Sequence, residues 1–179
     1  MSKLKVVILN GSMQQPSRTH VLCQALFDEL AEHLPGADLH WVEISQIGRS
    51  LGACLQRQEL PREIEADLQA IENADLLIAA SPVYRATFTG LFKHLVDFLG
   101  MTALVNKPVL LAATGGSPLH GLMLDHQMRP LFAMMQALTL PIGVYATESD
   151  FSGDYELASS AAKDRVKLAV EMALPNISR

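Results

Sequence analysis

A short polar segment at 10–19, which follows an apolar run, carries the clearest chemistry in the sequence. It offers a glycine for a tight turn and a set of anion-binding side chains: Ser12, Ser17, Arg18 and Thr19. A helix that starts here would add free amides and the positive end of its dipole, which favour an anion. The GxxxxGK[ST] and GxGxxG spacings are missing, so a phosphate cradle of another kind is predicted. The alternative is a plain helix start, capped by Ser17 or Thr19.

Two more loops follow apolar runs and could face a flat aromatic ligand. The loop at 81–90 combines apolar and aromatic residues with a proline of fixed φ, and it holds no obvious acid or base. The loop at 113–117 has two glycines, which let backbone amides approach a ring and stabilise negative charge on it. Each loop alone could be an ordinary turn. The candidates are Pro82, Val83, Tyr84 and Ala86 in the first loop and Thr114, Gly115 and Gly116 in the second.

The composition narrows the classes of function. The net charge is −5 and the basic residues form no run, so no nucleic-acid partner is expected. Residues 1–9 lack the long apolar stretch of a signal peptide, and no window approaches the ~18 apolar residues of a spanning helix. We therefore expect a cytoplasmic protein without membrane contact. Charged residues make up only 18%, which favours a surface partly covered in a homo-oligomer.

Cysteine and histidine spacings give no sign of a metal site. Cys23 and Cys54 lie far apart and form no CxxC pair, which is typical of free or buried thiols in a reducing compartment. The histidines form no HxxxH or HExxH pair with nearby carboxylates, so no metal is predicted.

Alternating apolar runs and helical periodicities must position the three loops. The runs predict strands at 5–9, 39–44, 75–80, 108–113 and 142–146, with helices at 19–34, from 61, from 90, at 119–138 and at 155–173. Residues 45–60 look irregular. This alternation predicts an α/β fold as a single domain over 1–179, a flavodoxin-like doubly wound parallel sheet of five strands in the order 2-1-3-4-5 with helices on both faces. In such a sheet the three loops meet at the carboxyl edge, where ligands bind.

A proline interrupts the long helix predicted at 119–138. Pro130 cannot donate a hydrogen bond to the carbonyl of His126, four residues earlier. The sequence therefore predicts a π-bulge or kink around His126.

Three motifs together resemble a known family. GSxxxxSRT after the first strand, SPVYRATFTGxxKHLVDFL after the third and TGG after the fourth are similar to NAD(P)H-dependent FMN reductases. The likeness spans nearly the whole chain and is strongest to the reductase component of alkanesulfonate and methanesulfonate two-component monooxygenase systems. It implies that Ser12, Ser17, Arg18 and Thr19 hold the FMN phosphate. It also implies that Pro82, Val83, Tyr84 and Ala86 border the ribityl chain and ring, and that Thr114, Gly115 and Gly116 contact the pyrimidine end.

The resemblance further implies hydride transfer from NADH or NADPH to FMN, with reduced FMN passed to a separate monooxygenase. Because the flavin carries that chemistry, we name no catalytic acid or base. The family likeness implies a homodimer or homotetramer. His126 stands where alkanesulfonate members carry a tyrosine, and we hypothesise that it lies near the flavin across an oligomer interface and modulates flavin exchange. Two alternatives stay open: a reductase of quinones, azo dyes or metal oxyanions that keeps its FMN, and a flavodoxin-type electron carrier.

Overall fold

A parallel sheet runs through the middle of the molecule in the computed structural model, which describes residues 3–177. Its strands follow the order β2-β1-β3-β4-β5, and β6 also pairs with β4. The predicted order is therefore confirmed. The outermost residues of the 1–179 range lie outside the described part. The strands are β1 (Lys5–Asn10), β2 (Asp38–Glu43), β3 (Leu76–Pro82), β4 (Pro108–Gly115), β5 (Leu138–Thr139) and β6 (Val144–Thr147).

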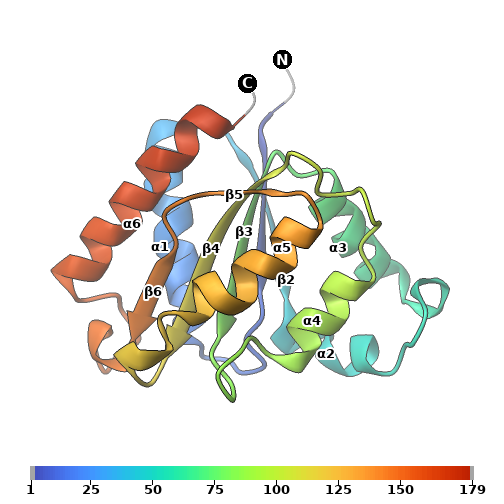
Figure 1. The fold of residues 1–179 in the computed structure, drawn as a ribbon, viewed down its shortest axis with the longest axis horizontal. Helices are drawn as coiled ribbons and strands as arrows, with labels where there is room; N and C mark the ends of the chain where they lie inside the picture. Colours follow the sequence, from blue (N-terminus) through green and yellow to red (C-terminus); the bar gives the residue numbers. More distant parts are fainter. Residues whose placement is uncertain (1–2, 178–179) are drawn as a thin grey trace.

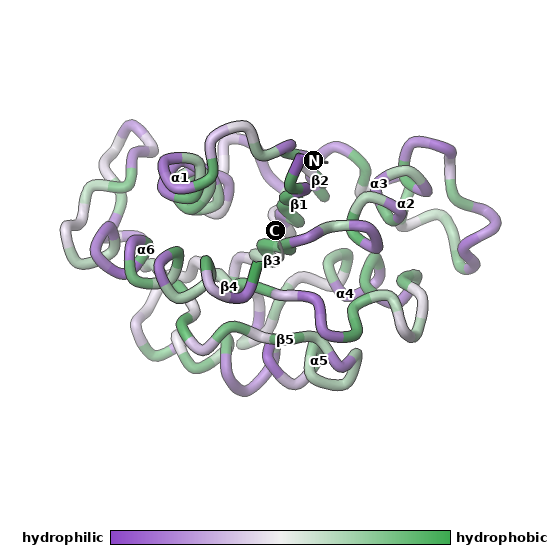
Figure 2. The backbone as a smooth tube through the Cα atoms, turned by 90° about the horizontal axis from the view of Figure 1, so that it is seen from above, coloured by the Kyte–Doolittle hydropathy of each residue, from purple (hydrophilic) through white to green (hydrophobic). Residues whose placement is uncertain are grey.

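The central strands form where the sequence is apolar without alternation. The first six residues of β3 and the first seven of β4 are buried, as expected for parallel strands covered on both faces. Figure 2 shows these strands in the hydrophobic colour at the centre of the molecule. Because β1, β3 and β4 all run parallel, their carboxyl ends meet at one edge.

Helices cover both faces of this sheet (Figure 1). One face carries α1 (Arg18–His33) and α6 (Ser160–Ala173), whose apolar side chains share a core cluster with alternate residues of β1, β3 and β4. The other face carries α2 (Ile44–Gly52), α3 (Arg62–Glu72), α4 (Gly90–Asp97) and α5 (Arg129–Met134), which enclose a second cluster. The two layers hold the sheet rigid, so the loops at its edge start from fixed points.

The predicted fifth strand at 142–146 corresponds to β6, and the short strand β5 precedes it, at the end of the helix predicted at 119–138. β5 pairs with Pro108 and Val109, and β6 pairs with β4 from Ala112 onward. Pro141 lies between the two strands and has no amide hydrogen, so it cannot continue the ladder.

One helix was missed, and two predicted helices were wrong in their extent. Residues 44–52 form α2, although 45–60 looked irregular; Gly48 interrupts the apolar pattern because a Cβ there would lie 2.9 Å from Leu91. The helix predicted at 119–138 is shorter at both ends: it consists of a π-helical turn at Leu124–Met128 and α5, which ends at Met134 because Gln136 has a left-handed φ of 58°. The last helix begins at Ser160 rather than 155, with the Ser159 side chain as its cap.

The predicted π-bulge is confirmed. Residues Leu124–Met128 form a π-helical turn, and the amide of Arg129 donates to the carbonyl of Leu124, five residues earlier. His126 lies within this turn, and α5 follows directly with Pro130 in its first turn. Across residues 3–177, none of the helices combines the length and the apolarity that a bilayer crossing demands.

Candidate functional site at the carboxyl edge of the sheet

A pocket of about 210 Å³ opens where β1, β3 and β4 end. It brings together residues from all three loops that the sequence singled out. Ala86 is the exception, because it lies outside this lining. The predicted residues in the lining are Ser12, Ser17, Arg18, Thr19, Pro82, Val83, Tyr84, Thr114, Gly115 and Gly116.

The loop after β1 is fastened to the neighbouring elements by its backbone. The amide of Gly11 donates to the carbonyl of Ala80 at 2.7 Å, and the Thr89 hydroxyl donates to the carbonyl of Gly11 at 2.8 Å. A Cβ on Gly11 would lie 2.8 Å from the buried ring of Phe92 and 3.1 Å from the Ala80 oxygen. Only glycine fits this crossing, so the loop leaves β1 along a fixed path.

The start of α1 combines a helix cap with free amides. Ser17 is the N-cap, and its hydroxyl oxygen accepts from the amide of His20 at 3.2 Å. Within the described residues, no hydrogen bond engages the amides of Arg18 and Thr19, as expected for a first helical turn. The alternative that Ser17 caps the helix is thus correct. The cap leaves the amides of Arg18 and Thr19, two residues that line the pocket, as free donors at the positive end of the helix dipole.

A buried pair of threonines ties this helix start to β4. The hydroxyls of Thr19 and Thr114 lie 2.7 Å apart, and both side chains are buried. One of the two hydroxyls donates a hydrogen bond to the other, and this bond holds the two segments in register.

A polar network lies beneath the loop. The amide of Ser12 donates to the side-chain oxygen of Asn10, whose amide group donates to Glu43 at 2.8 Å. The other oxygen of Glu43 lies 2.6 Å from Nδ1 of His20, and the His20 ring stacks on Trp41 with centroids 4.5 Å apart. Glu43 is buried, so these contacts supply the partners that its carboxylate needs. The network fixes the orientation of Asn10 and therefore of the loop above it.

The loop after β3 contains a tight two-residue turn. The backbone groups of Tyr84 and Thr87 bond to each other in both directions, and Arg85 and Ala86 between them have φ of 51° and 68°. Such turns favour Gly, Asn or Asp, so each of these residues carries a backbone strain of about 1–3 kcal/mol. The turn displaces Ala86 from the pocket into a separate groove of about 170 Å³, which His126 also lines.

The end of β4 packs tightly on Tyr145 of β6. The Tyr145 hydroxyl donates to the carbonyl of Ser117 at 2.6 Å. Burial raises the pKa of Tyr145, so its hydroxyl stays protonated as a donor. A Cβ on Gly115 would overlap the same hydroxyl oxygen. Gly115 is therefore needed for close packing, in addition to the amide access that the sequence suggested.

The connection after β6 supplies two pocket residues that sequence reasoning missed. Glu148 and Tyr155 both line the pocket. Glu148 pairs with the guanidinium of Arg18 at 2.6 Å, and the Tyr155 ring lies 5.5 Å from the same group. The rule that ligands bind beyond the carboxyl ends of parallel strands, applied to the last strand as well, would have pointed to this connection.

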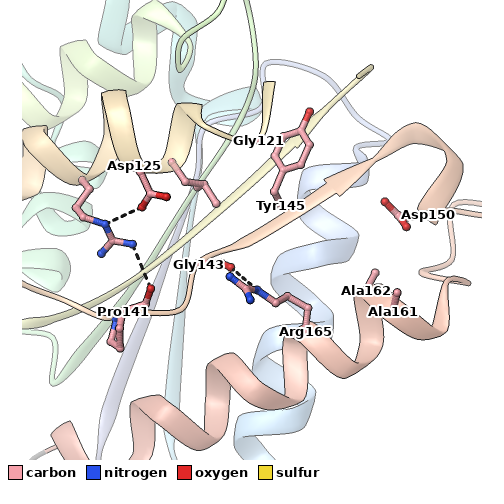
Figure 3. Close-up of a pocket in the computed structure, with 11 residues that line it drawn as sticks. Gly121, Asp125, Pro141, Gly143, Tyr145, Asp150, Ala161, Ala162 and Arg165 are labelled. Atoms are coloured by element: carbon pink, nitrogen blue, oxygen red, sulfur yellow. Dashed lines mark hydrogen bonds and ion pairs between the residues drawn. The ribbon is translucent and has the colours of Figure 1, made fainter. Parts of the chain in front are cut away.

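A neighbouring cavity of about 420 Å³ lies between the π-helical turn, β6 and α6 (Figure 3). Its arginines serve the backbone of the β5–β6 connection. Arg165 donates to the carbonyl of Gly143 at 2.9 Å, and Arg129 donates to that of Leu140 at 2.8 Å and to Asp125 at 2.9 Å. None of the predicted binding residues lines this cavity. Within 3–177, no group of three His, Cys, Asp or Glu side chains is placed to hold a metal ion.

Comparison with known proteins decides the family. A family model described as NADPH-dependent FMN reductase matches residues 4–152. The chain belongs to this family. The NADH-dependent FMN reductase SfnF of Pseudomonas fluorescens is 60% identical over 172 residues, which cover 96% of this chain and 91% of that protein. The FMN reductase (NADPH) of Pseudomonas aeruginosa is 52% identical, with 97% of this chain and 92% of that one covered.

A solved structure described as the apo form of an NADH:FMN oxidoreductase shares the fold. Its TM-score is 0.84 at 26% sequence identity, and the match covers 97% of this chain and 89% of that one. The predicted family, enzyme class and fold are thus confirmed. The relatives above include NADH- and NADPH-named reductases, so both nicotinamides stay in consideration.

Proposed function

We propose that this chain, as one domain over 1–179, reduces FMN with NADH or NADPH and supplies the reduced flavin to a separate sulfonate monooxygenase. One observation carries the proposal: hydroxyls, free amides and a guanidinium from the 10–19 loop meet the ends of β3 and β4 in one pocket of a chain from the FMN reductase family. The delivery to a sulfonate monooxygenase rests on the motif resemblance noted in the sequence.

The pocket passes a simple test of fit for FMN. Its donors match a phosphate group, and Gly115 and Gly116 in its lining present backbone rather than side chain to a planar ring. About 210 Å³ is below the roughly 300–1,000 Å³ of sites that enclose a whole ligand. We infer that the pocket holds the phosphate end and part of the ring, and that the remainder lies at the surface. Such partial enclosure suits a flavin that must leave.

Each predicted residue then has a proposed role. The hydroxyls and guanidinium of the 12–19 group hold the phosphate, and the amides of the first helical turn add donors to it. The residues before the hairpin turn border the ribityl chain and ring, and the amides near Gly115 face the pyrimidine end. Bound FMN itself supplies the hydride chemistry, so the protein provides orientation and electrostatics.

His126 is proposed to modulate flavin exchange. It is exposed on the π-helical turn, and it shares its groove with Ala86 and the exposed side chains of Leu119 and Leu122. We infer that the ring extends beyond the pocket toward Ala86, and that a second copy of the chain covers this groove. His126→Ala should therefore change the FMN dissociation rate, whereas His33→Ala on α1 should not. Equal rates in both variants would remove the proposal.

The proposed reaction is tested by following nicotinamide absorbance with and without added FMN. An FMN-supplying reductase should consume NADH or NADPH in proportion to added FMN and should copurify with little flavin. Tightly copurified FMN with activity toward quinones or azo dyes would favour the acceptor reductase instead, and no consumption would favour an electron carrier. We place the activity in the cytoplasm, an assignment supported by the free thiols of Cys23 and Cys54.

A further inference from the structure

The proposed phosphate ligand Arg18 already holds a carboxylate. Its guanidinium lies 2.6 Å from an oxygen of Glu148, at the rim of the pocket. Of the described residues that line this pocket, Arg18 is the one cation and Glu148 the one acid. A carboxylate therefore occupies a position on the guanidinium that an incoming phosphate would also use.

The backbone after β6 fixes the place of Glu148. It opens a short turn, in which Asp150 accepts hydrogen bonds from the amide and the hydroxyl of Thr147 at 2.7 and 2.8 Å. Two further amides, those of Ala158 and Ser159, donate to the carbonyl of Asp150. Glu148 thus starts from an anchored main chain, while its own side chain stays 65% exposed and free to swing away.

The ring of Tyr155 makes a second contact with the Arg18 guanidinium. The ring lies 5.5 Å from the centre of the Arg18 guanidinium, within the range of a cation–π contact. A planar guanidinium can stack on a ring and still present its edge to a carboxylate or a phosphate. The geometry therefore allows the exchange of one anion for the other without moving Arg18.

We propose that Glu148 competes with the FMN phosphate for Arg18 and so sets the rate at which flavin leaves. The inference rests on the proposed function, because it assumes Arg18 as a phosphate ligand. A phosphate on Arg18 must displace the carboxylate, and the displaced group stays near it as a like charge. When the phosphate withdraws, Glu148 restores the ion pair and lowers the cost of leaving the guanidinium unpaired.

Glu148→Gln tests this competition by removing the charge while keeping the shape. Exposed ion pairs are weak, since two unit charges about 4 Å apart in water interact by only about 1 kcal/mol. The Glu148→Gln variant should therefore bind FMN roughly threefold to tenfold more tightly than the parent. The FMN dissociation rate should fall by the same factor. Glu156→Gln is the matched control, since this exposed glutamate lies in the same connection but outside the pocket lining, and it should leave both values unchanged.

Riboflavin separates competition for phosphate from a structural effect. It lacks the phosphate, so Glu148→Gln should leave riboflavin affinity unchanged while it tightens FMN binding. In an Arg18→Gln background, the tightening for FMN should largely disappear. Unchanged or weaker FMN binding in Glu148→Gln, or equal tightening for riboflavin, would overturn the inference.

These readouts are binding constants measured without a nicotinamide, so they are independent of turnover. A protein that fails to oxidise NADH and NADPH, yet shows the tightening in Glu148→Gln, would refute the proposed function and support this inference. A protein that oxidises a nicotinamide with FMN, but binds FMN equally well with Glu148 and with Gln at this position, would support the proposed function and refute this inference.

Discussion

Gly115→Ala should destabilise the fold and damage the pocket through one side chain, Tyr145. The added Cβ would overlap the Tyr145 hydroxyl, and it would lie 3.3 Å from the ring carbon that carries this hydroxyl and 3.4 Å from a methyl of Val83. The ring cannot retreat freely, because the hydroxyl donates to the carbonyl of Ser117 at 2.6 Å. Either the ring moves and this hydrogen bond breaks, or the end of β4 shifts.

The cost follows from the two effects. Overpacking costs about 1–3 kcal/mol, and the lost hydrogen bond adds about 0.5–1.5 kcal/mol, so a loss of about 1.5–4.5 kcal/mol is expected in the free energy of unfolding. For a chain of this length that corresponds to a fall in Tm of roughly 3–18 °C. FMN affinity should fall as well, because the displaced segment forms one wall of the pocket.

Urea unfolding of five proteins tests this reasoning: the parent, Gly115→Ala, Gly116→Ala, Tyr145→Phe and the double variant of Gly115→Ala with Tyr145→Phe. Gly116→Ala is the matched control, since a Cβ there meets nothing within 4 Å, and its stability should match that of the parent. Tyr145→Phe removes the overlapping oxygen, so in that background Gly115→Ala should cost only about 1 kcal/mol, the residual overpacking of a tight contact. A stability of Gly115→Ala equal to the parent, or an undiminished cost beside Phe at 145, would refute the argument.

Three other outcomes are expected. The hydrogen bond from Arg57 lowers the pKa of Glu65, so this contribution to stability is full above about pH 4.5 and is lost as the pH falls. Arg57→Met should lower the free energy of unfolding by about 1–3 kcal/mol at pH 7, measured by urea unfolding. It should also make the loss of stability with falling pH less steep, and an unchanged pH dependence would contradict this. Burial raises the pKa of the Cys23 thiol, so this cysteine should resist a thiol reagent until the protein unfolds, and modification in the native state would be contrary evidence. Thr19→Val leaves the buried hydroxyl of Thr114 unpaired, so it should lower the free energy of unfolding by about 1–3 kcal/mol. An unchanged stability would show that the hydrogen bond between the two threonines does not stabilise the fold.

The sheet was predictable because its signals are local and strong. Continuous apolar runs such as those of β3 and β4 are typical of strands buried on both faces, and the alternation with helices favours a doubly wound order. Pro130 likewise predicted the π-helical turn at Leu124–Met128, since a missing amide hydrogen has a local consequence.

The errors arose where tertiary packing decided the structure. Gly48 obscures α2 in the sequence, and its lack of a Cβ lets a terminal methyl of Leu91 from α4 pack closely against α2. The short strand β5 lies at the end of a segment with helical periodicity, and only its pairing with Pro108 and Val109 of β4 reveals it. The strain at Arg85 and Ala86 also depends on the fold around the turn, and it moved Ala86 out of the predicted pocket.

The missed pocket residues have the same explanation. Arg18 stands out in the sequence beside a glycine, serines and a threonine, but its partner Glu148 lies in a distant connection with no motif around it. Nothing local marks Glu148 or Tyr155, because their role comes only from the position that the β6–α6 connection gives them at the sheet edge.

A crystal structure of the protein with bound FMN tests the central claim most directly. We expect the phosphate oxygens within hydrogen-bond distance of the side chains or amides of Ser12, Ser17, Arg18 and Thr19, with the ring between Tyr84 and the Gly115 backbone. Density for the flavin elsewhere, for example in the cavity beside Arg165, with those four residues out of contact, would contradict the account.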